Sequence, residues 1–192
     1  EVGCSSGFML DAFREMDINC YGIEPSGEFG EFLISNGYTV FESLESIKEM
    51  KFDIITHFFV FEHIADPFDF ISQNLRLLND GGVMVSEIPC ANDPLTSLYN
   101  IDAFERFYWS IAHHYYYTPE SLRHILEKMN CKYELVPEQR YDISNHMTWM
   151  LDGKPGGQDK YTEQLGNNVI QAYKEQMLDT WQCDTIFLYV WK

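Results

Sequence analysis

The stretch Glu1-Val2-Gly3-Cys4-Ser5-Ser6-Gly7 decides the fold of this 192-residue chain. An acid ends a strand, small residues form a turn, and the amphipathic segment 8–16 follows as a helix. Gly3 permits a sharp turn and Gly7 lets the helix start close to the strand, so backbone amides can approach a ligand. The pattern predicts a nucleotide-type site, with a simple structural turn as the alternative.

A second acid, Glu24, follows about twenty residues later at the end of a predicted strand, where a carboxylate can accept hydrogen bonds from ribose hydroxyls. In open α/β sheets, ligands bind outside the carboxyl ends of the strands. The fingerprint of dinucleotide-binding dehydrogenases, Gly-x-Gly-x-x-Gly, does not match, because Gly3, Ser5 and Gly7 occupy every second position. A nicotinamide dehydrogenase is therefore the weaker alternative.

Strand-like and helix-like segments alternate along the chain. Strands are predicted at residues 20–24, 38–41, 52–58, 83–88, 131–136 and 185–191, and helices at 8–16, 28–35, 44–50, 68–78, 118–129 and 169–178. Residues 79–82, Asn-Asp-Gly-Gly, are expected to form a turn. This alternation predicts an α/β fold with a mostly parallel sheet.

The charge and the cysteine content of the chain exclude several classes of partner and site. A formal charge of -17 argues against nucleic acid and against an anionic membrane surface, since both need clustered Lys and Arg. No stretch approaches the roughly 18 to 20 apolar residues of a membrane-spanning helix. The five cysteines are odd in number and form no Cys-x-x-Cys pair, so neither a disulfide framework nor a metal site is predicted. A reduced, cytoplasmic setting is expected.

The opening loop, Glu24 and the strands that follow resemble, in their order along the chain, the motifs of class I S-adenosylmethionine-dependent methyltransferases. The opening loop resembles that family's acid followed by Gly-x-Gly-x-Gly, with Ser5 in place of the middle glycine. Residues 21–26 resemble the second strand with its ribose-binding acid, and residues 52–67 resemble the fourth strand and its loop. Residues 77–85 resemble the entry to the fifth strand. The resemblance covers residues 1 to about 90.

The resemblance implies a Rossmann-like fold, with a mostly parallel seven-stranded sheet and an antiparallel last strand at 185–191. It also implies that the chain is cut off upstream, so that the first strand is only partly present. Residues 1–137 are expected to form the cofactor-binding core, and residues 184–192 its final strand. Residues 138–183 are expected to be an insertion that covers the substrate or makes a homodimer contact.

The implied cofactor is S-adenosylmethionine. The residues that the resemblance assigns to its binding are Glu1, Gly3, Cys4, Ser5, Gly7, Glu24, His57 and Phe58. Glu42 and Ser43 are candidate neighbours of the adenine. Ordinary packing is the alternative role for the side chains outside the loop and Glu24.

Methyl transfer from a sulfonium is an in-line displacement in which positioning supplies most of the acceleration. A hydroxyl acceptor also benefits from a general base, and histidine titrates in the right range. His63 and His113 are the candidates, and Glu62 is either the base or the partner that orients a histidine. The alternatives are that His63 only caps or braces its loop and that His113 is a hydrogen-bonded structural histidine.

The segment Glu62-His63-Ile64-Ala65-Asp66-Pro67, with residues 113–122, is similar to methyltransferases acting on small metabolites, quinones and sugars. Residues 139–141 and 153–157 resemble members associated with surface polysaccharide synthesis. The resemblance implies O-methylation of a small acceptor, a sugar or nucleotide-linked sugar. The alternatives are C-methylation of a sugar or quinol, and a catalytically silent binding module. The aromatic residues between 104 and 117 are expected to form core or lid more than a stacking surface.

Overall fold

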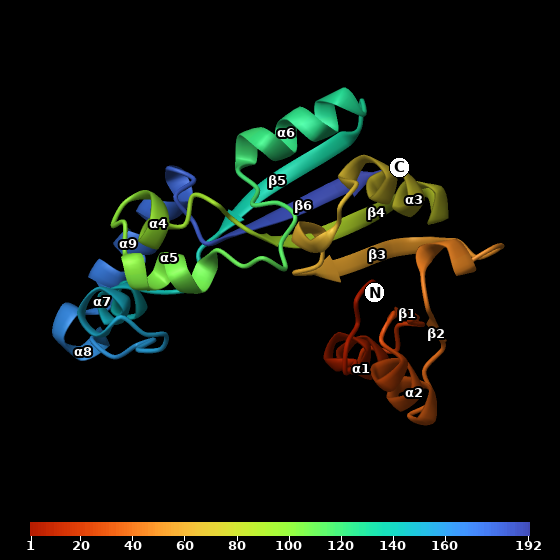
Figure 1. The fold of residues 1–192 in the computed structure, drawn as a ribbon, viewed down its shortest axis with the longest axis horizontal. Coiled ribbons are helices and arrows are strands. Elements are labelled where there is room, and N and C mark those ends of the chain that lie inside the picture. The colour runs from red at the N-terminus through yellow and green to blue at the C-terminus, as the bar shows by residue number, and fades with distance from the viewer.

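The computed structural model describes residues 1–192 and contains two β-sheets (Figure 1). In the smaller sheet, β1 (Gly22–Ile23) pairs in parallel with β2 (Val40–Phe41). The larger sheet has the order β3 (Phe52–Phe58), β4 (Leu78–Pro89), β6 (Thr185–Trp191), β5 (Lys132–Glu138). The bounds of β3 and β6 are those that the sequence predicts.

Strand direction in the larger sheet also agrees with the prediction. β3 and β4 are parallel, whereas β6 lies antiparallel between β4 and β5. The expected turn at residues 79–82 is found as a bulge inside β4, because the register shifts from Phe52 opposite Leu78 to Ile54 opposite Val83. Gly81 has φ of +81°, a left-handed conformation that suits glycine.

Residues 1–3 connect the two sheets. Val2 forms a parallel bridge with Ile23, and its N–H donates to the Thr56 carbonyl at 2.8 Å. One bridged residue is too short to form a strand, so the predicted seven-stranded sheet is found as six strands in two sheets. The α/β class and the antiparallel last strand are confirmed.

Helices flank both sheets. α1 (Phe8–Glu15) and α2 (Gly27–Ser35) lie beside the smaller sheet, while α3 (Pro67–Leu77) and α6 (Pro119–Lys128) pack against the larger one (Figure 1). Short 3₁₀ turns, η1 (Leu44–Ser46) and η2 (Phe61–His63), follow β2 and β3. As predicted, Thr118 begins α6: its hydroxyl accepts from the Ser121 N–H at 3.2 Å, forming a capping box.

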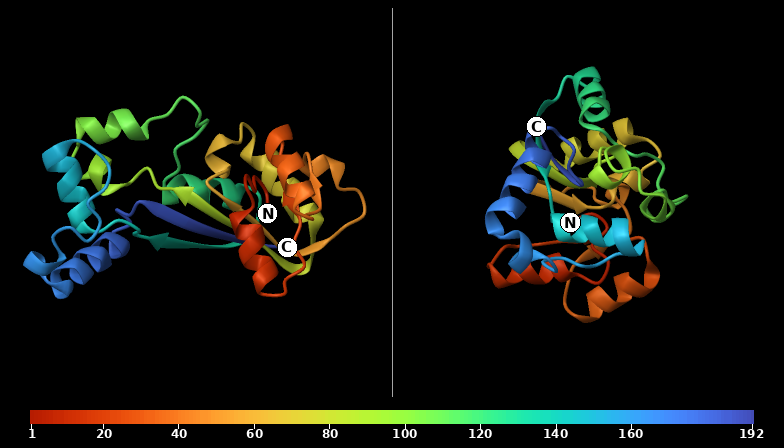
Figure 2. Two further views of the ribbon diagram at one scale, coloured as in Figure 1. Left: turned by 90° about the horizontal axis from the view of Figure 1, so that it is seen from below. Right: turned by 90° about the vertical axis from the view of Figure 1, so that its left-hand side faces the viewer.

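A group of helices gathers at one end of the larger sheet, away from α1 and α2 (Figures 1 and 2). It comprises α4 (Pro94–Ser97), α5 (Asp102–Tyr108), α7 (Ile143–Asp152), α8 (Thr162–Leu165) and α9 (Asn167–Asp179). The predicted helix at 169–178 is found as α9, whereas α5 and α7 are not predicted. No helix of the protein is long and apolar enough to cross a bilayer.

Candidate active site

The opening loop depends on two glycines. Gly3 and Gly7 have φ of +70° and +87°, a region that L side chains rarely adopt. A Cβ at Gly3 would lie 2.6 Å from a methyl of Val60, and one at Gly7 would lie 2.5 Å from a methyl of Leu33. Both backbone conformation and space therefore require glycine at these positions.

Ser5 occupies the position at which the resembled motif has its middle glycine. Its φ of 46° is also left-handed, which costs a non-glycine residue of order 1 kcal/mol. The Ser5 N–H donates to a carboxylate oxygen of Glu24 at 2.7 Å. This charge-assisted hydrogen bond offsets the strain and explains how serine is accommodated.

Glu24 connects the loop to the end of β1. One carboxylate oxygen accepts from Ser5, and the other accepts from the Ser26 N–H at 2.9 Å. The side chain is buried, yet an ionised carboxylate has about four lone-pair positions, so two stay free. Glu24 can thus hold the loop in place and still accept hydrogen bonds from a ligand.

A cavity of about 390 Å³ lies against this loop, at the carboxyl ends of β1, β2 and β3. Its walls include Gly3, Pro25, Glu42, Ser43, Val60 and Ile64. Glu42 and Ser43, the sequence candidates for contact with adenine, are on its wall. Cavities of this size hold small molecules and cofactors.

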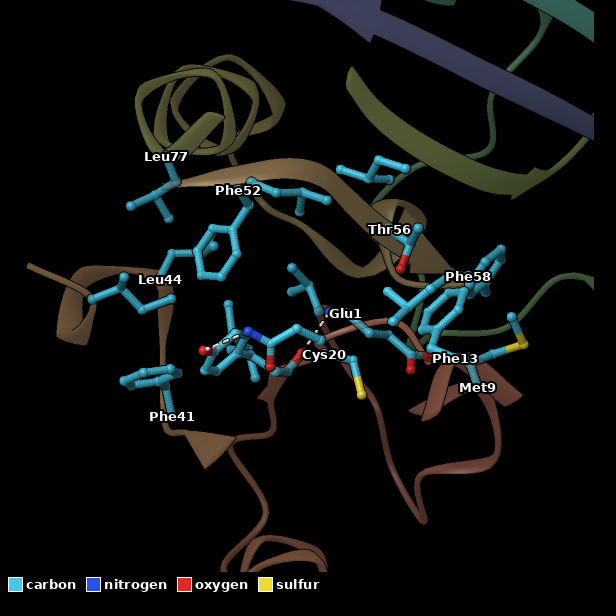
Figure 3. Close-up of a pocket in the computed structure, with 18 residues that line it drawn as sticks. Glu1, Met9, Phe13, Cys20, Phe41, Leu44, Phe52, Thr56, Phe58 and Leu77 are labelled. Carbon is cyan, nitrogen blue, oxygen red and sulfur yellow. Dashed lines mark hydrogen bonds between the residues drawn. The ribbon is translucent and has the colours of Figure 1, made fainter. Parts of the chain in front are cut away.

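A second cavity of about 270 Å³ lies between the two sheets, and Figure 3 shows its lining. Glu1 and Phe58, two predicted cofactor-binding residues, line this cavity together with Phe13, Phe41 and Phe52. The lining is almost entirely apolar, and burial raises the pKa of the Glu1 carboxyl to about 7. These two side chains are therefore on the wall of a cavity other than the one beside Gly3.

Two further predicted cofactor-binding side chains point into the interior. Cys4 packs with Leu10 and Leu33, and burial raises the pKa of its thiol to about 11. His57 is fully buried, and its Nε2 is hydrogen-bonded to the Ser86 hydroxyl at 2.9 Å. Burial lowers the pKa of His57 to about 3. β3 turns this side chain toward α3, where its ring centre lies 5.0 Å from that of Phe70, and its contact with the cofactor stays a prediction.

The three candidates for catalysis come together. η2 places Glu62 and His63 directly after β3, and the loop after α5 brings His113 beside them. The two imidazole rings lie 4.7 Å apart and nearly perpendicular. The Glu62 carbonyl holds this loop by accepting from the N–H groups of His114 and Tyr115, at 2.8 and 3.2 Å.

This cluster contains buried polar atoms that have no partner within the protein. They are Glu62 Oε2, His113 Nδ1 and the Tyr117 hydroxyl. Burial raises the pKa of Glu62, and burial together with the neighbouring His63 lowers the pKa of His113. Each unpartnered group costs about 1–3 kcal/mol, so these atoms are available to a ligand.

Sequence reasoning missed an ion pair at the end of β4. Arg140 pairs with Glu87, a buried acid, and the guanidinium lies 5.0 Å from the centre of the Phe59 ring. An acid near the carboxyl end of a buried strand is the signal that could have identified Glu87. Arg140 lies in the motif of residues 139–141, for which no ion pair is predicted.

Sequence reasoning also missed a buried polar network beyond β4. His146 Nδ1 lies 2.6 Å from the Tyr173 hydroxyl, which lies 3.0 Å from that of Tyr99. Gln139 donates to Asp184 at 2.9 Å. Gln139 Nε2 lies 3.4 Å from His146 Nε2, and this contact connects α7 and α9 to the residues that flank β5 and β6.

Comparison with known proteins agrees with this geometry. A family described as "Methyltransferase domain" matches residues 1–136, which include the loop, Glu24 and the cluster of Glu62, His63 and His113. The chain belongs to this family. The fold class and the class I methyltransferase family predicted from the motifs are thereby confirmed.

Among curated proteins, this methyltransferase domain is 26% identical over 95 residues to a ubiquinone biosynthesis O-methyltransferase of Bradyrhizobium sp. (strain ORS 278). That match spans 44% of the chain and 37% of the relative. Among solved structures, a SAM-dependent methyltransferase from Archaeoglobus fulgidus is similar with a TM-score of 0.62 and 19% identity, covering 100% of this chain and 84% of that one.

A SAM-dependent methyltransferase from Thermotoga maritima, described as a possible histamine N-methyltransferase, has a TM-score of 0.60 at 16% identity. The alignment covers 100% of this methyltransferase domain and 79% of that chain. At these identities, the two structures support the fold and leave the acceptor open.

Proposed function

We propose that this methyltransferase domain transfers the methyl group of S-adenosylmethionine to an oxygen of a small acceptor. The observation that carries the proposal is the loop of residues 1–7, bound to Glu24 beside a cavity of about 390 Å³. S-adenosylmethionine is the methyl donor, as it is for the two SAM-dependent methyltransferases that share the fold.

The chain's own groups divide the work of holding the cofactor. The free lone pairs of Glu24 accept hydrogen bonds from the ribose hydroxyls. Gly3 of the loop, which lines the cavity, would face the methionine portion, and Glu42 and Ser43 would line the adenine end. The side chains of Glu1 and Phe58 line the other cavity and those of Cys4 and His57 point into the interior, so these four residues would contribute only through their backbone or through packing.

The cluster of Glu62, His63 and His113 serves the acceptor. The acceptor oxygen attacks the sulfonium methyl, a C–O bond forms, and the C–S bond breaks with its electron pair left on sulfur. The cluster assists loss of the hydroxyl proton, which ends on water. The products are a methyl ether and S-adenosylhomocysteine, and positioning of the two reactants supplies most of the acceleration.

The acceptor that we propose is a sugar or nucleotide-linked sugar of surface polysaccharide synthesis. The rings of Tyr108, Trp109 and Tyr116 pack in succession, and Tyr116 lies 5.0 Å from His113. A half-exposed indole beside the cluster supports this class, because aromatic faces pack on sugar rings. The quinol hydroxyl is the second candidate, favoured by the O-methyltransferase relative. Residues 138–183 would cover the bound acceptor.

An acceptor panel tests the proposal. The protein is incubated with S-adenosylmethionine and either nucleotide sugars or catechol-type quinol analogues, and formation of S-adenosylhomocysteine is measured. We expect turnover with a nucleotide sugar and formation of a methyl ether. Turnover with the catechols alone would replace the sugar by a quinol. Failure to bind S-adenosylmethionine would contradict the enzyme assignment, and binding of NAD instead would favour a dehydrogenase.

A further inference from the structure

We propose that Glu62, His63 and His113 form a binding site for a divalent metal ion with the preferences of Zn²⁺. Each side chain offers one ligand atom, and these atoms lie within 4.8 Å of one another. Two of the residues come from η2 and the third from the loop after α5, so the site exists only in the folded chain.

His63 is prepared for coordination. Its Nδ1 lies 2.9 Å from the Ala112 carbonyl oxygen. A carbonyl only accepts, so Nδ1 carries the hydrogen and Nε2 presents its lone pair. Metal-binding histidines generally donate their other N–H to a carbonyl or carboxylate in this way, which fixes the tautomer and the orientation of the ring.

Glu62 and His113 supply atoms that the protein leaves unused. Glu62 is 2% exposed, and its Oε2 has no hydrogen-bond partner. His113 Nδ1 is likewise buried and unpartnered. Buried polar atoms are almost always hydrogen-bonded, so two unpartnered ones on residues of the same cluster need an explanation. One bound cation would satisfy both.

The distances allow a site to close around an ion. In a tetrahedral site with bonds of about 2.1 Å, neighbouring ligand atoms lie roughly 3.4 Å apart. The present spread of 4.8 Å exceeds this by an amount that side-chain rotation can remove. The backbone need not move, because the Glu62 carbonyl already holds the His113 loop through the N–H groups of His114 and Tyr115.

The ligand types select the ion. Two imidazole nitrogens and one carboxylate oxygen suit Zn²⁺ and similar transition ions, whereas Mg²⁺ and Ca²⁺ prefer oxygen ligands throughout. Three protein ligands leave the fourth position open, as in catalytic zinc sites. The binding step stands on the geometry alone. The role of the ion rests on the proposed function: the acceptor hydroxyl would occupy the open position and lose its proton to water more readily.

Calorimetry tests the binding step. EDTA-treated protein, without cofactor or acceptor, is titrated with Zn²⁺, and Co²⁺ is added separately to record its visible ligand-field bands. We expect one equivalent of Zn²⁺ and a tetrahedral Co²⁺ spectrum. His113→Gln should weaken Zn²⁺ binding by roughly 100-fold or more, since one of three ligands is lost. His114→Gln, which changes the exposed neighbouring histidine, should leave it unchanged.

Two results would overturn the metal site: no saturable binding by the wild type, or equal Zn²⁺ affinity in His113→Gln and His114→Gln. Since Glu62 is buried, Glu62→Gln is compared through the Co²⁺ spectrum of protein shown to be folded by circular dichroism, and an unchanged spectrum would also overturn it. If turnover persists in EDTA and the protein binds no metal, the metal site is refuted and the proposed function stands. If the protein binds the metal but not S-adenosylmethionine, the metal site stands and the proposed function is refuted.

Discussion

Two glutamates are buried on the ligand side of the fold, and their surroundings are opposite. Both carboxylate oxygens of Glu24 accept backbone N–H groups, from Ser5 and Ser26. Glu62 is more deeply buried, yet its Oε2 has no partner. A buried carboxylate whose oxygens accept backbone hydrogen bonds holds a loop in place, whereas a buried carboxylate oxygen without a partner is available to a ligand. On this contrast we base the proposal that Glu24 serves the cofactor and Glu62 the acceptor.

Removing the unsatisfied acid should give the largest effect. Glu62→Ala is expected to lower kcat/KM for the acceptor by roughly 10²–10⁴-fold, the usual contribution of a group that assists proton transfer. Affinity for S-adenosylhomocysteine should stay within about twofold, because Glu62 does not line the cavity beside Gly3. Steady-state kinetics and calorimetry measure the two quantities. Glu31→Ala, an exposed acid of α2, is the control. An equally large fall in cofactor affinity would contradict the proposal that Glu62 serves the acceptor and not the cofactor.

The buried His146 offers a test through pH. Burial lowers its pKa to about 4, so in the unfolded chain, where the value is near 6.5, it binds more protons between these pH values. Its contribution to stability is present above pH 6.5 and is lost as pH falls toward 4, by about 3 kcal/mol.

In His146→Gln this loss should be absent, so the difference in unfolding free energy between wild type and variant should shrink on acidification. Urea titrations at pH 7, 5.5 and 4 measure it. The exposed His124→Gln is the control. If the difference in unfolding free energy between wild type and His146→Gln is the same at all three pH values, His146 does not contribute to the pH dependence of stability.

The loop that Glu24 fixes should be sensitive to its glycines. Gly7→Ala combines a left-handed φ with a contact of 2.5 Å to Leu33, and should lower the unfolding free energy by about 2 kcal/mol. Gly37→Ala is the matched control, since its φ is +83° but a Cβ there meets open space, so only about 1 kcal/mol is expected. Thermal and urea unfolding compare the two. Equal losses would mean that the approach to Leu33 is not tight.

The smallest effect is expected at Ser5. Ser5→Gly relieves left-handed strain but increases the freedom of the unfolded chain, and the two terms, each of about 1 kcal/mol, nearly cancel. The hydrogen bond to Glu24 comes from the backbone and stays. Stability and cofactor affinity should both remain within about 0.5 kcal/mol of wild type. A larger loss would show that the serine hydroxyl has a role of its own.

The sequence was most informative where spacing alone determines structure. The strand at 52–58 and the Thr118 cap are local patterns, and each is found. The hydrogen bond from the Ser5 N–H to Glu24 spans 19 residues and was not predicted. The side on which His57 points could not be predicted, because both faces of β3 are buried. Ile55 and His57 are buried on one face and Thr56 on the other. The buried network around His146 joins residues far apart in sequence, which no local pattern reports.

Cofactor titration of one variant pair tests the central claim, that the loop of residues 1–7 and Glu24 build the methyl-donor site. S-adenosylhomocysteine is titrated calorimetrically into wild type, Glu24→Ala and Glu28→Ala, the last being an exposed acid of α2. Loss of two charge-assisted hydrogen bonds should weaken binding by roughly 10²–10³-fold in Glu24→Ala, while Glu28→Ala binds as wild type does. Equal affinity in all three proteins would contradict the account.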